Sequence, residues 1–342
     1  MLTTDCKQGL HFFEKFQEIP TKGAAAVKFF TIDDDLFLVF ANHHGDNSGP
    51  QAKSVVYKME NKRFILIQTL STHGAYAIEH FKIDGVHYMA IANFFVASTV
   101  IYKWSTDKFE KFQVISTISL SGFKFVTIEG DHYLAGTNSF DSSVYKWQQG
   151  RFVKYQDISS YGAEACDSIV IANETFLVYP NYYQSRTTES SVYKWSGGHF
   201  VKFQSVKTPI TSSAKFFRVN GHVFLAFAGM NTNSPIYKWD GVKFTLFQEV
   251  PTKGAIDIHP FEMNGEIFFA VANYVGYIGG YSVRSVVYKA SGAQFSLYQD
   301  LQTFGARGVH ATVHKGQGYL VFANHRKNNF NFNINSFVYK FT

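Results

Sequence analysis

The sequence has few of the residues that hold small or unusual folds together. Of its 342 residues only two are cysteine, Cys6 and Cys166, and seven are proline. Two cysteines this far apart make neither a metal-binding spacing nor a disulfide framework, and so few prolines exclude a collagen-like or proline-rich chain. We expect Cys166 to be a small buried residue of an inner strand. Whether it pairs with Cys6 depends on their Cα separation, which the sequence leaves open.

Long apolar runs and a secretory signal are also missing. No run of 18 or more apolar residues occurs, so we expect no transmembrane helix. The start of the chain, residues 1–6, lacks the basic and apolar regions of a signal peptide, as expected of an intracellular chain or a mature secreted one. One sequon, Asn173-Glu174-Thr175, stands in a predicted turn, where it could be glycosylated in a secreted protein.

Motifs of catalysis and of nucleotide binding are absent as well. The sequence contains no GxSxG, HExxH, P-loop, GxGxxG or EF-hand pattern, so we expect no enzymatic activity and no organic cofactor. The oxygen-rich segment 45–49 lacks the ligand spacing of a calcium loop. The acidic run at residues 33–35 is more typical of a solvated turn.

What the sequence has in abundance is aromatic residues, 36 Phe and 20 Tyr, and they recur in a pattern. The tripeptide Ile/Val-Tyr-Lys or a close variant returns about every 47 residues, a period typical of propeller blades. Its tyrosines are Tyr57, Tyr102, Tyr145, Tyr193, Tyr237, Tyr288 and Tyr339. A glutamine after an aromatic or aliphatic residue recurs in step with them, as Gln17, Gln68, Gln113, Gln156, Gln204, Gln248 and Gln299. A small residue followed by asparagine forms a third anchor in six of the seven repeats; Ala228-Gly229 replaces it in the fifth.

Each repeat is predicted to contain four short strands. In the second repeat they are residues 75–83, 87–93, 98–104 and 109–115, and Asp84-Gly85 between the first two is a hairpin signal. Four strands per repeat of this length predict an all-β, seven-bladed β-propeller with four antiparallel strands per blade.

The two ends of the chain predict how the ring closes. Residues 12–19 resemble a fourth strand without the preceding three, and residues 337–341 resemble a third strand without a fourth. We therefore expect the N-terminal strand to complete the last blade, which leaves few exposed edges. The single domain 1–342 would comprise blades at about 20–70, 71–116, 117–159, 160–207, 208–251, 252–302 and 303–342, the last completed by strand 12–19.

The positive charge of the chain belongs to the repeat itself. A lysine follows each anchor tyrosine, and without these seven lysines the net charge of +6 becomes −1. The ring would spread them evenly, whereas nucleic-acid binding needs a focused basic stripe. We therefore expect no nucleic-acid partner.

The inner strands carry one ionisable residue at a matching position of every blade: Lys28, Glu79, Lys124, Asp167, Lys215, His259 and His310. Glu79, Asp167 and Asp257 are candidates to hold a cation such as Ca²⁺ in the central channel. The alternative, which we favour, is ion pairing between adjacent blades, such as Lys28 with Glu79 and Lys124 with Asp167.

The loops between second and third strands vary most and share one face of a propeller, so we expect a partner there. The longest belong to blades 1, 6 and 7, which are neighbours in the ring. The candidate residues are His43, His44, Phe94, Phe95, Tyr182, Tyr183, Arg186, Tyr274, Tyr277, Tyr281, Arg284, His325, Arg326, Phe330 and Phe332. Tyr and Arg are common interface anchors, although such aromatics could equally fold back onto the blades or stack on a sugar.

The consensus Phe-x-x-Phe-Gln-x-Ile…Gly-Ala…Phe-Leu-x-x-Ala-Asn…Ser-x-Val-Tyr-Lys-Trp resembles the EAR or EPTP (epitempin) repeat, most closely at residues 109–115 and 142–147. This family includes the leucine-rich glioma-inactivated proteins and the thrombospondin-type laminin G domain and EAR protein. The resemblance implies a seven-bladed propeller in an extracellular or secreted setting, recognition of an extracellular or cell-surface protein, and no enzymatic activity. The matching residues define the scaffold, and the loop residues match no transferable pattern. We therefore expect a non-enzymatic recognition module for a protein, with carbohydrate binding as the alternative.

Overall fold

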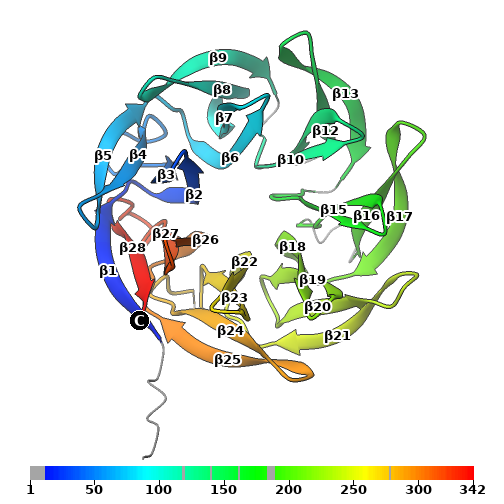
Figure 1. Cartoon of the computed structure of the whole chain (residues 1–342). Coiled ribbons are helices and arrows are strands. Elements are labelled where there is room, and N and C mark those ends of the chain that lie inside the picture. The colour runs from blue at the N-terminus through cyan, green and yellow to red at the C-terminus, as the bar shows by residue number, and fades with distance from the viewer. Residues whose placement is uncertain (1–11, 118–119, 139–140, 161, 183–188, 277–278) are drawn as a thin grey trace, which may run out of the picture.

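The computed structural model describes residues 12–117, 120–138, 141–160, 162–182, 189–276 and 279–342. Seven antiparallel sheets of four strands each stand around a central axis like the blades of a propeller (Figure 1). The predicted fold class is confirmed. Cys6 lies outside the described residues, whereas Cys166 is 1% exposed and packs in the core between blades 3 and 4.

The blades follow one another in chain order. Blade 1 contains β2(Ala24–Ile32), β3(Asp35–Asn42), β4(Ser54–Glu60) and β5(Arg63–Leu70). Blade 2 contains β6(Ala75–Ile83), β7(Val86–Asn93), β8(Ser98–Ser105) and β9(Lys108–Ser116), with the 3₁₀ turn η1(Phe94–Val96) between β7 and β8. Blade 3 contains β10(Gly122–Ile128), β11(Asp131–Thr137), β12(Asp141–Gln148) and β13(Arg151–Ser159). Blade 4 contains β14(Asp167–Ile171), β15(Glu174–Tyr179), β16(Glu189–Ser196) and β17(His199–Lys207). Blade 5 contains β18(Thr211–Val219), β19(His222–Gly229), β20(Ser234–Trp239) and β21(Phe244–Val250). Blade 6 contains β22(Ala255–Met263), β23(Glu266–Asn273), β24(Ser285–Ser291) and β25(Gln294–Leu301).

Blade 7 joins the two ends of the chain. It contains β26(Ala306–His314), β27(Gln317–Asn324) and β28(Asn335–Phe341), and its outer strand is β1(Phe13–Pro20). The register pairs Phe13 with Phe341 and Pro20 with Asn335, and β1 lies beside β28 at the outer edge of the ring (Figure 1). The predicted closure by the N-terminal strand is confirmed.

The burial pattern explains why each repeat folds this way. The second strand of a blade has neighbouring strands on both edges and packed blades on both faces, so β3 is buried at every residue after Asp35. The outer strand has one face in solvent, and β9 accordingly buries only Phe109 and Ile115. Tight hairpins such as Asp84-Gly85, both with positive φ, connect the first two strands. The sequon residue Asn173 lies exposed in such a turn, between β14 and β15, as predicted.

The repeated glutamine joins each blade to the next. Its side-chain amide donates to the backbone carbonyl of a phenylalanine on the next outer strand, and its carbonyl accepts from the same residue's N–H. In blade 4, Gln204 makes these bonds to Phe244 at 2.8 and 2.9 Å. The same pair of bonds is made by Gln17 to Phe64, Gln68 to Phe109, Gln113 to Phe152, Gln156 to Phe200, Gln248 to Phe295 and Gln299 to Phe13. These glutamine bridges therefore connect all seven joints of the ring, including the joint at which the two ends of the chain meet.

A hydrogen bond between two buried hydroxyl groups links the start of the third strand to the loop that leaves each blade. In blade 6, Ser285 Oγ lies 2.8 Å from Thr303 Oγ1 in the loop that leaves the blade. The equivalent pairs are Ser54–Thr72, Thr99–Thr117, Ser142–Ser160, Ser190–Thr208, Ser234–Thr252 and Ser336–Thr21. In every blade, each of these two buried hydroxyl groups therefore has a hydrogen-bond partner.

We predict that Gln204→Ala lowers the free energy of unfolding by about 1–3 kcal/mol, because the backbone N–H and C=O of Phe244 lose their partners at a partly buried site. Urea unfolding of the purified variant measures this. Gln302→Ala, which changes an exposed glutamine of an inter-blade loop, is the matched control. Equal stability of both variants would show that the bridge contributes nothing.

We also predict that deletion of residues 1–20 abolishes the cooperative thermal transition, because it removes β1 and leaves the edge of β28 unpaired. Calorimetry of the truncated chain measures this. A synthetic peptide of residues 12–20, added in excess, should restore a transition. A truncated chain that melts like the full chain would contradict the closure.

Candidate functional site

The loops that follow the second strands, together with those that join the blades, form one face of the ring, the loop face. Backbone hydrogen bonds connect them: the Phe94 N–H donates to the Gly74 carbonyl at 3.0 Å, and the Gly74 N–H donates to the Pro50 carbonyl of the preceding blade. The same pattern joins His325 to Gly305 and Gly305 to Tyr281 between blades 7 and 6. Loops of adjacent blades are therefore held in fixed positions relative to each other.

Nine of the predicted partner-binding residues meet on this face and form what we call the rim cluster. Its members are His43, His44, Phe94, Phe95, Tyr274, Tyr281, His325, Arg326 and Phe332. They come from blades 1, 2, 6 and 7. His43 is central, with ring centroids 5.1 Å from Phe95 and 5.6 Å from His325, so the contacts run without a break from blade 2 to blade 6.

Arg326 brings a positive charge into the rim cluster. Its guanidinium carbon lies 4.2 Å from the ring centroid of Tyr281, 5.3 Å from that of Tyr274 and 5.8 Å from that of Phe332. Three aromatic faces around one guanidinium restrict its side chain and favour the charged group there.

Beneath the rim cluster lies a polar group that the sequence analysis did not identify as a site. Arg307 of β26 donates a hydrogen bond to the Tyr76 hydroxyl of β6, and that hydroxyl donates to Glu164 Oε1 at 2.9 Å. Arg307 Nη2 also lies 3.4 Å from Glu164 Oε2. These residues belong to blades 7, 2 and 4, so together they cross the end of the central channel, above a cavity of about 120 Å³.

The backbone explains how Arg307 and Tyr76 reach this position. Each is the extra residue of a β-bulge at the start of an innermost strand, where the register shifts between Ala306 and Gly308 and between Ala75 and Ala77. Bulges re-aim a side chain out of the strand alternation. The same bulge recurs in blades 1 and 6, where Ala25 and Ile256 are its extra residues. What distinguishes blades 2 and 7 in the sequence is the large polar residue between two small ones, Ala-Tyr-Ala and Ala-Arg-Gly.

The rim cluster has a buried floor and an exposed edge. Tyr274 and His325 are only 6% and 4% exposed and form the floor, whereas Phe95 is 52% exposed. Phe330, another predicted residue, is 87% exposed in the loop before β28. The aromatics that fold back onto the blades thus support others that face solvent.

The remaining predicted residues lie apart from the rim cluster or outside the described residues. Arg284 is exposed and donates to the Asp300 carboxylate at 2.7 and 3.2 Å, within blade 6. Tyr182 is half-buried in the loop after β15. Tyr183, Arg186 and Tyr277 lie outside the described residues.

Burial keeps two histidines of the rim cluster, His43 and His325, neutral. Burial, together with the positive charges of Arg307, His44 and Arg326, lowers the pKa of His43 to about 3. Burial and Arg307 likewise lower the pKa of His325 well below its ordinary value. In the described part of the chain, His43 Nδ1, both ring nitrogens of His325 and Arg326 Nε are buried without a hydrogen-bond partner. Such groups gain when a ligand supplies the missing partner.

The two ion pairs named in the favoured alternative form across adjacent blades. Lys28 forms an ion pair with Glu79, and Lys124 Nζ lies 2.6 Å from Asp167 Oδ1. Burial alone would raise the pKa of Asp167, but Lys124 and Lys215 hold it below its ordinary value. Burial raises the pKa of Asp257, whose carboxylate accepts from Ser213 Oγ at 2.8 Å and from the Val309 N–H at 3.0 Å.

These contacts bear on the predicted calcium site. The carboxylates of Glu79, Asp167 and Asp257 are already engaged by lysines, by a serine and by backbone amides. Among the residues that the structure describes, no group of three or more His, Cys, Asp or Glu side chains could hold a metal ion. The channel cation stays a prediction that these contacts do not favour.

The oxygen-rich segment 45–49 serves a different purpose. Asp46 Oδ1 accepts from the Phe332 N–H at 2.6 Å, and Asn333 Oδ1 accepts from the Asp46 N–H at 3.3 Å. Asp46 of blade 1 therefore holds the long loop of blade 7, and with it Phe332, in the rim cluster.

We predict that acid destabilises the protein through His43 and His325. Because the histidine pKa is lower in the folded state, the unfolded chain binds more protons than the folded chain below pH about 6.5. The free energy of unfolding is therefore at its full value above that pH and falls as the pH decreases towards the folded-state pKa. His43→Gln should lose about 2 kcal/mol less stability than the parent between pH 6.5 and 5. Urea unfolding at both pH values measures this. His199 is exposed at the start of β17, so His199→Gln should lose as much stability between these pH values as the parent does. An equal loss in His43→Gln would contradict the prediction.

Comparison with known proteins places these observations in a family. The EPTP domain matches six times, at residues 13–58, 63–105, 108–148, 151–196, 199–240 and 243–289. Each match begins in the outer strand of one blade and ends in the third strand of the next, so the sequence unit is offset from the blade by one strand. This offset is the one that β1 uses to close the ring.

Two curated proteins are similar over a shorter stretch. The human thrombospondin-type laminin G domain and EAR repeat-containing protein is 41% identical over 83 residues, which are 24% of this chain and 12% of the relative. The mouse protein of the same name is 39% identical over 83 residues, with the same coverage. The aligned stretch is thus about an eighth of the length of these relatives. Among the described residues, no helix is long and apolar enough to span a membrane. Because the six matches cover well over half of the sequence, the chain belongs to the EPTP domain family.

Proposed function

We propose that this propeller is a non-enzymatic extracellular module that binds a partner protein through the rim cluster. The observation that carries the proposal is the continuous set of ring contacts from Phe95 in blade 2 through His43 and His325 to Tyr281 in blade 6. Four blades contribute to one surface, as expected of a single large binding site rather than of one small site per blade.

The chemistry of the rim cluster supports a protein partner. Protein interfaces are enriched in Tyr, Phe and Arg, and their central anchors sit among groups that exclude water. Here Arg326 lies among Tyr274, Tyr281 and Phe332, and Phe95 and Phe330 expose their rings on the same loop face.

A groove beside the rim cluster gives the partner further surface. It has a volume of about 1,180 Å³ and runs along the loop face and the outer side of blade 6. Tyr281 and Lys327 line it from the loop face, and Leu297, 60% exposed, lines it from the outer strand β25. Tyr281 belongs to both the groove and the rim cluster, so a bound chain could contact both at once.

The extracellular setting rests on the family. EAR-repeat relatives carry laminin G modules by name, and the sequon at Asn173 is exposed, as glycosylation of a secreted protein requires. The identity of the partner is therefore sought first among cell-surface proteins.

We predict that the propeller binds selectively to one or a few members of a library of cell-surface ectodomains, and that Phe95→Ala and Tyr281→Ala each weaken this binding about tenfold or more, as loss of an aromatic anchor does. Surface plasmon resonance measures the affinity. Val114→Ser, on the exposed outer strand β9, is the control and should bind as the parent does.

A glycan array separates the alternative from the proposal. Selective glycan binding that Tyr281→Ala abolishes would replace protein recognition by carbohydrate recognition at the same surface. Ectodomain binding that survives both aromatic substitutions would instead move the site away from the rim cluster.

A further inference from the structure

The joints between blades contain a repeated aromatic slot on the side opposite the loop face. A tryptophan at the end of the third strand inserts between two aromatic rings of the preceding blade. Trp195 of blade 4 lies 5.0 Å from Tyr133 and 6.4 Å from Tyr155 of blade 3, and 5.0 Å from Phe200 of its own blade. Trp239 of blade 5 has the same three kinds of neighbour, Phe176, Phe203 and Phe244.

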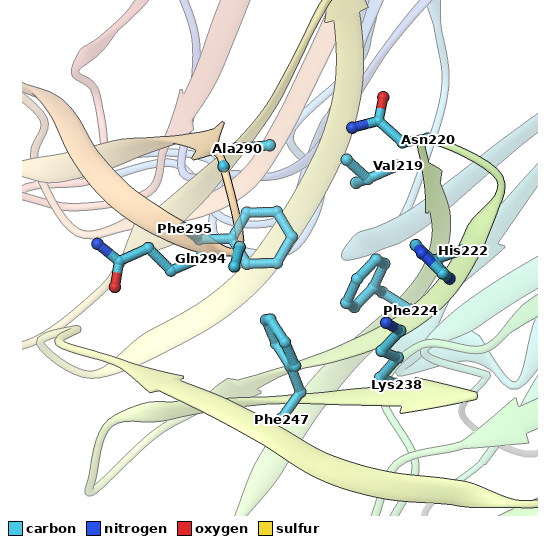
Figure 2. Close-up of a pocket in the computed structure, with 11 residues that line it drawn as sticks. Val219, Asn220, His222, Phe224, Lys238, Phe247, Ala290, Gln294 and Phe295 are labelled. Carbon is cyan, nitrogen blue, oxygen red and sulfur yellow. The ribbon is translucent and has the colours of Figure 1, made fainter. Parts of the chain in front are cut away.

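The joint between blades 5 and 6 keeps the slot but lacks the tryptophan. Ala290 occupies that position in β24, whereas the corresponding residues of the other blades are Met59, Trp104, Trp147, Trp195, Trp239 and Phe341. The three aromatic neighbours are retained as Phe224, Phe247 and Phe295. Their rings border a cavity of about 310 Å³, with Ala290 at one side (Figure 2).

The cavity is open to solvent at the hairpin end of the blades. Asn220 and His222 line it from the β18–β19 hairpin, and Gly292 and Ala293 line it from the β24–β25 hairpin. Phe247 remains 37% exposed, whereas Phe224 and Phe295 are 5% exposed. A partner residue could therefore enter from outside without displacing the core.

A positive charge stands at the edge of this cavity. Lys238 lies beside Phe224, with its Nζ 5.9 Å from the ring centroid. At the equivalent place in blade 4, Lys194 pairs with Glu174 at 2.5 Å, and in blade 3 Lys146 pairs with Asp131 at 2.8 Å. In blade 5 His222 stands where the carboxylate would be, and no carboxylate of the described residues lies within 4.0 Å of Lys238.

We propose that this cavity is a binding site for a tryptophan side chain of a partner protein, flanked in the partner's sequence by an acidic residue. The fold itself shows what fits, because three aromatic neighbours of the same kind hold an indole ring in the adjacent joint. A carboxylate next to that indole would supply the partner that Lys238 lacks. The site is on the other side of the ring from the rim cluster and does not depend on the function proposed for that cluster.

The test uses the full chain and the peptide acetyl-Asp-Trp-Asp-amide, with binding followed by NMR titration. We expect saturable binding that is at least fivefold weaker for acetyl-Lys-Trp-Lys-amide and absent for acetyl-Asp-Ala-Asp-amide. Ala290→Trp should abolish binding, because the new side chain fills the cavity, and should raise the melting temperature, which shows that the variant is folded. Lys238→Gln should remove the preference for the acidic peptide.

Two controls keep the outcome clear. Lys103→Gln changes the equivalent lysine of blade 2, where Trp147 fills the adjacent slot, and should bind like the parent. Indole-3-acetate tests the bare ring: if it binds and the peptide does not, the site takes small aromatic acids and the protein partner is wrong. If neither binds, or if Ala290→Trp binds the peptide as the parent does, the cavity is a packing defect and the proposal falls.

Discussion

The ring depends on the contact between adjacent blades, and the repeated glutamine provides the hydrogen bonds of that contact. Each blade leaves its outer strand with unpaired backbone groups near the joint, and the glutamine side chain satisfies two of them in the following blade. The same pair of directional hydrogen bonds recurs at every joint, so each blade is attached to the next in the same way. Because Gln299 bridges to Phe13, the same rule acts across the two ends of the chain.

Because the joints between blades are alike, the loops between second and third strands can differ in length and sequence without changing the ring. The loop face carries the long segments of blades 1, 6 and 7, and the rim cluster forms because the ring makes these blades neighbours. Burial holds His43 neutral, and the guanidinium of Arg326 packs against Tyr281, so the surface combines aromatic rings with a cationic side chain. Asp46, Tyr76 and Glu164 then tie loops and inner strands of different blades together beneath it.

The two sides of the ring depart from the repeat in opposite ways. On the loop face, insertions add residues that the scaffold does not need. At the joint between blades 5 and 6, a substitution removes a side chain that the scaffold normally has, and the aromatic neighbours of Ala290 stay in place. The loop insertions and the Ala290 substitution each create a distinct surface. The neighbouring blades, which lack these changes, show the unmodified repeat at the same position.

The sequence by itself determined the number of blades, the four strands of each, the closing strand and the pairing of Lys28 and Lys124 with their carboxylates, because all of these follow from residues that recur at fixed spacing. It also named all nine residues of the rim cluster, since long loops of neighbouring blades must lie together. Only the tertiary structure showed Arg307, Tyr76 and Glu164 as one group. The bulge recurs at the same place in blades 1, 2, 6 and 7, but the contacts that its side chains make across the channel leave no periodic signal. The cavity at Ala290 was likewise hidden, since a missing side chain has meaning only once its neighbours are seen to surround the space it leaves.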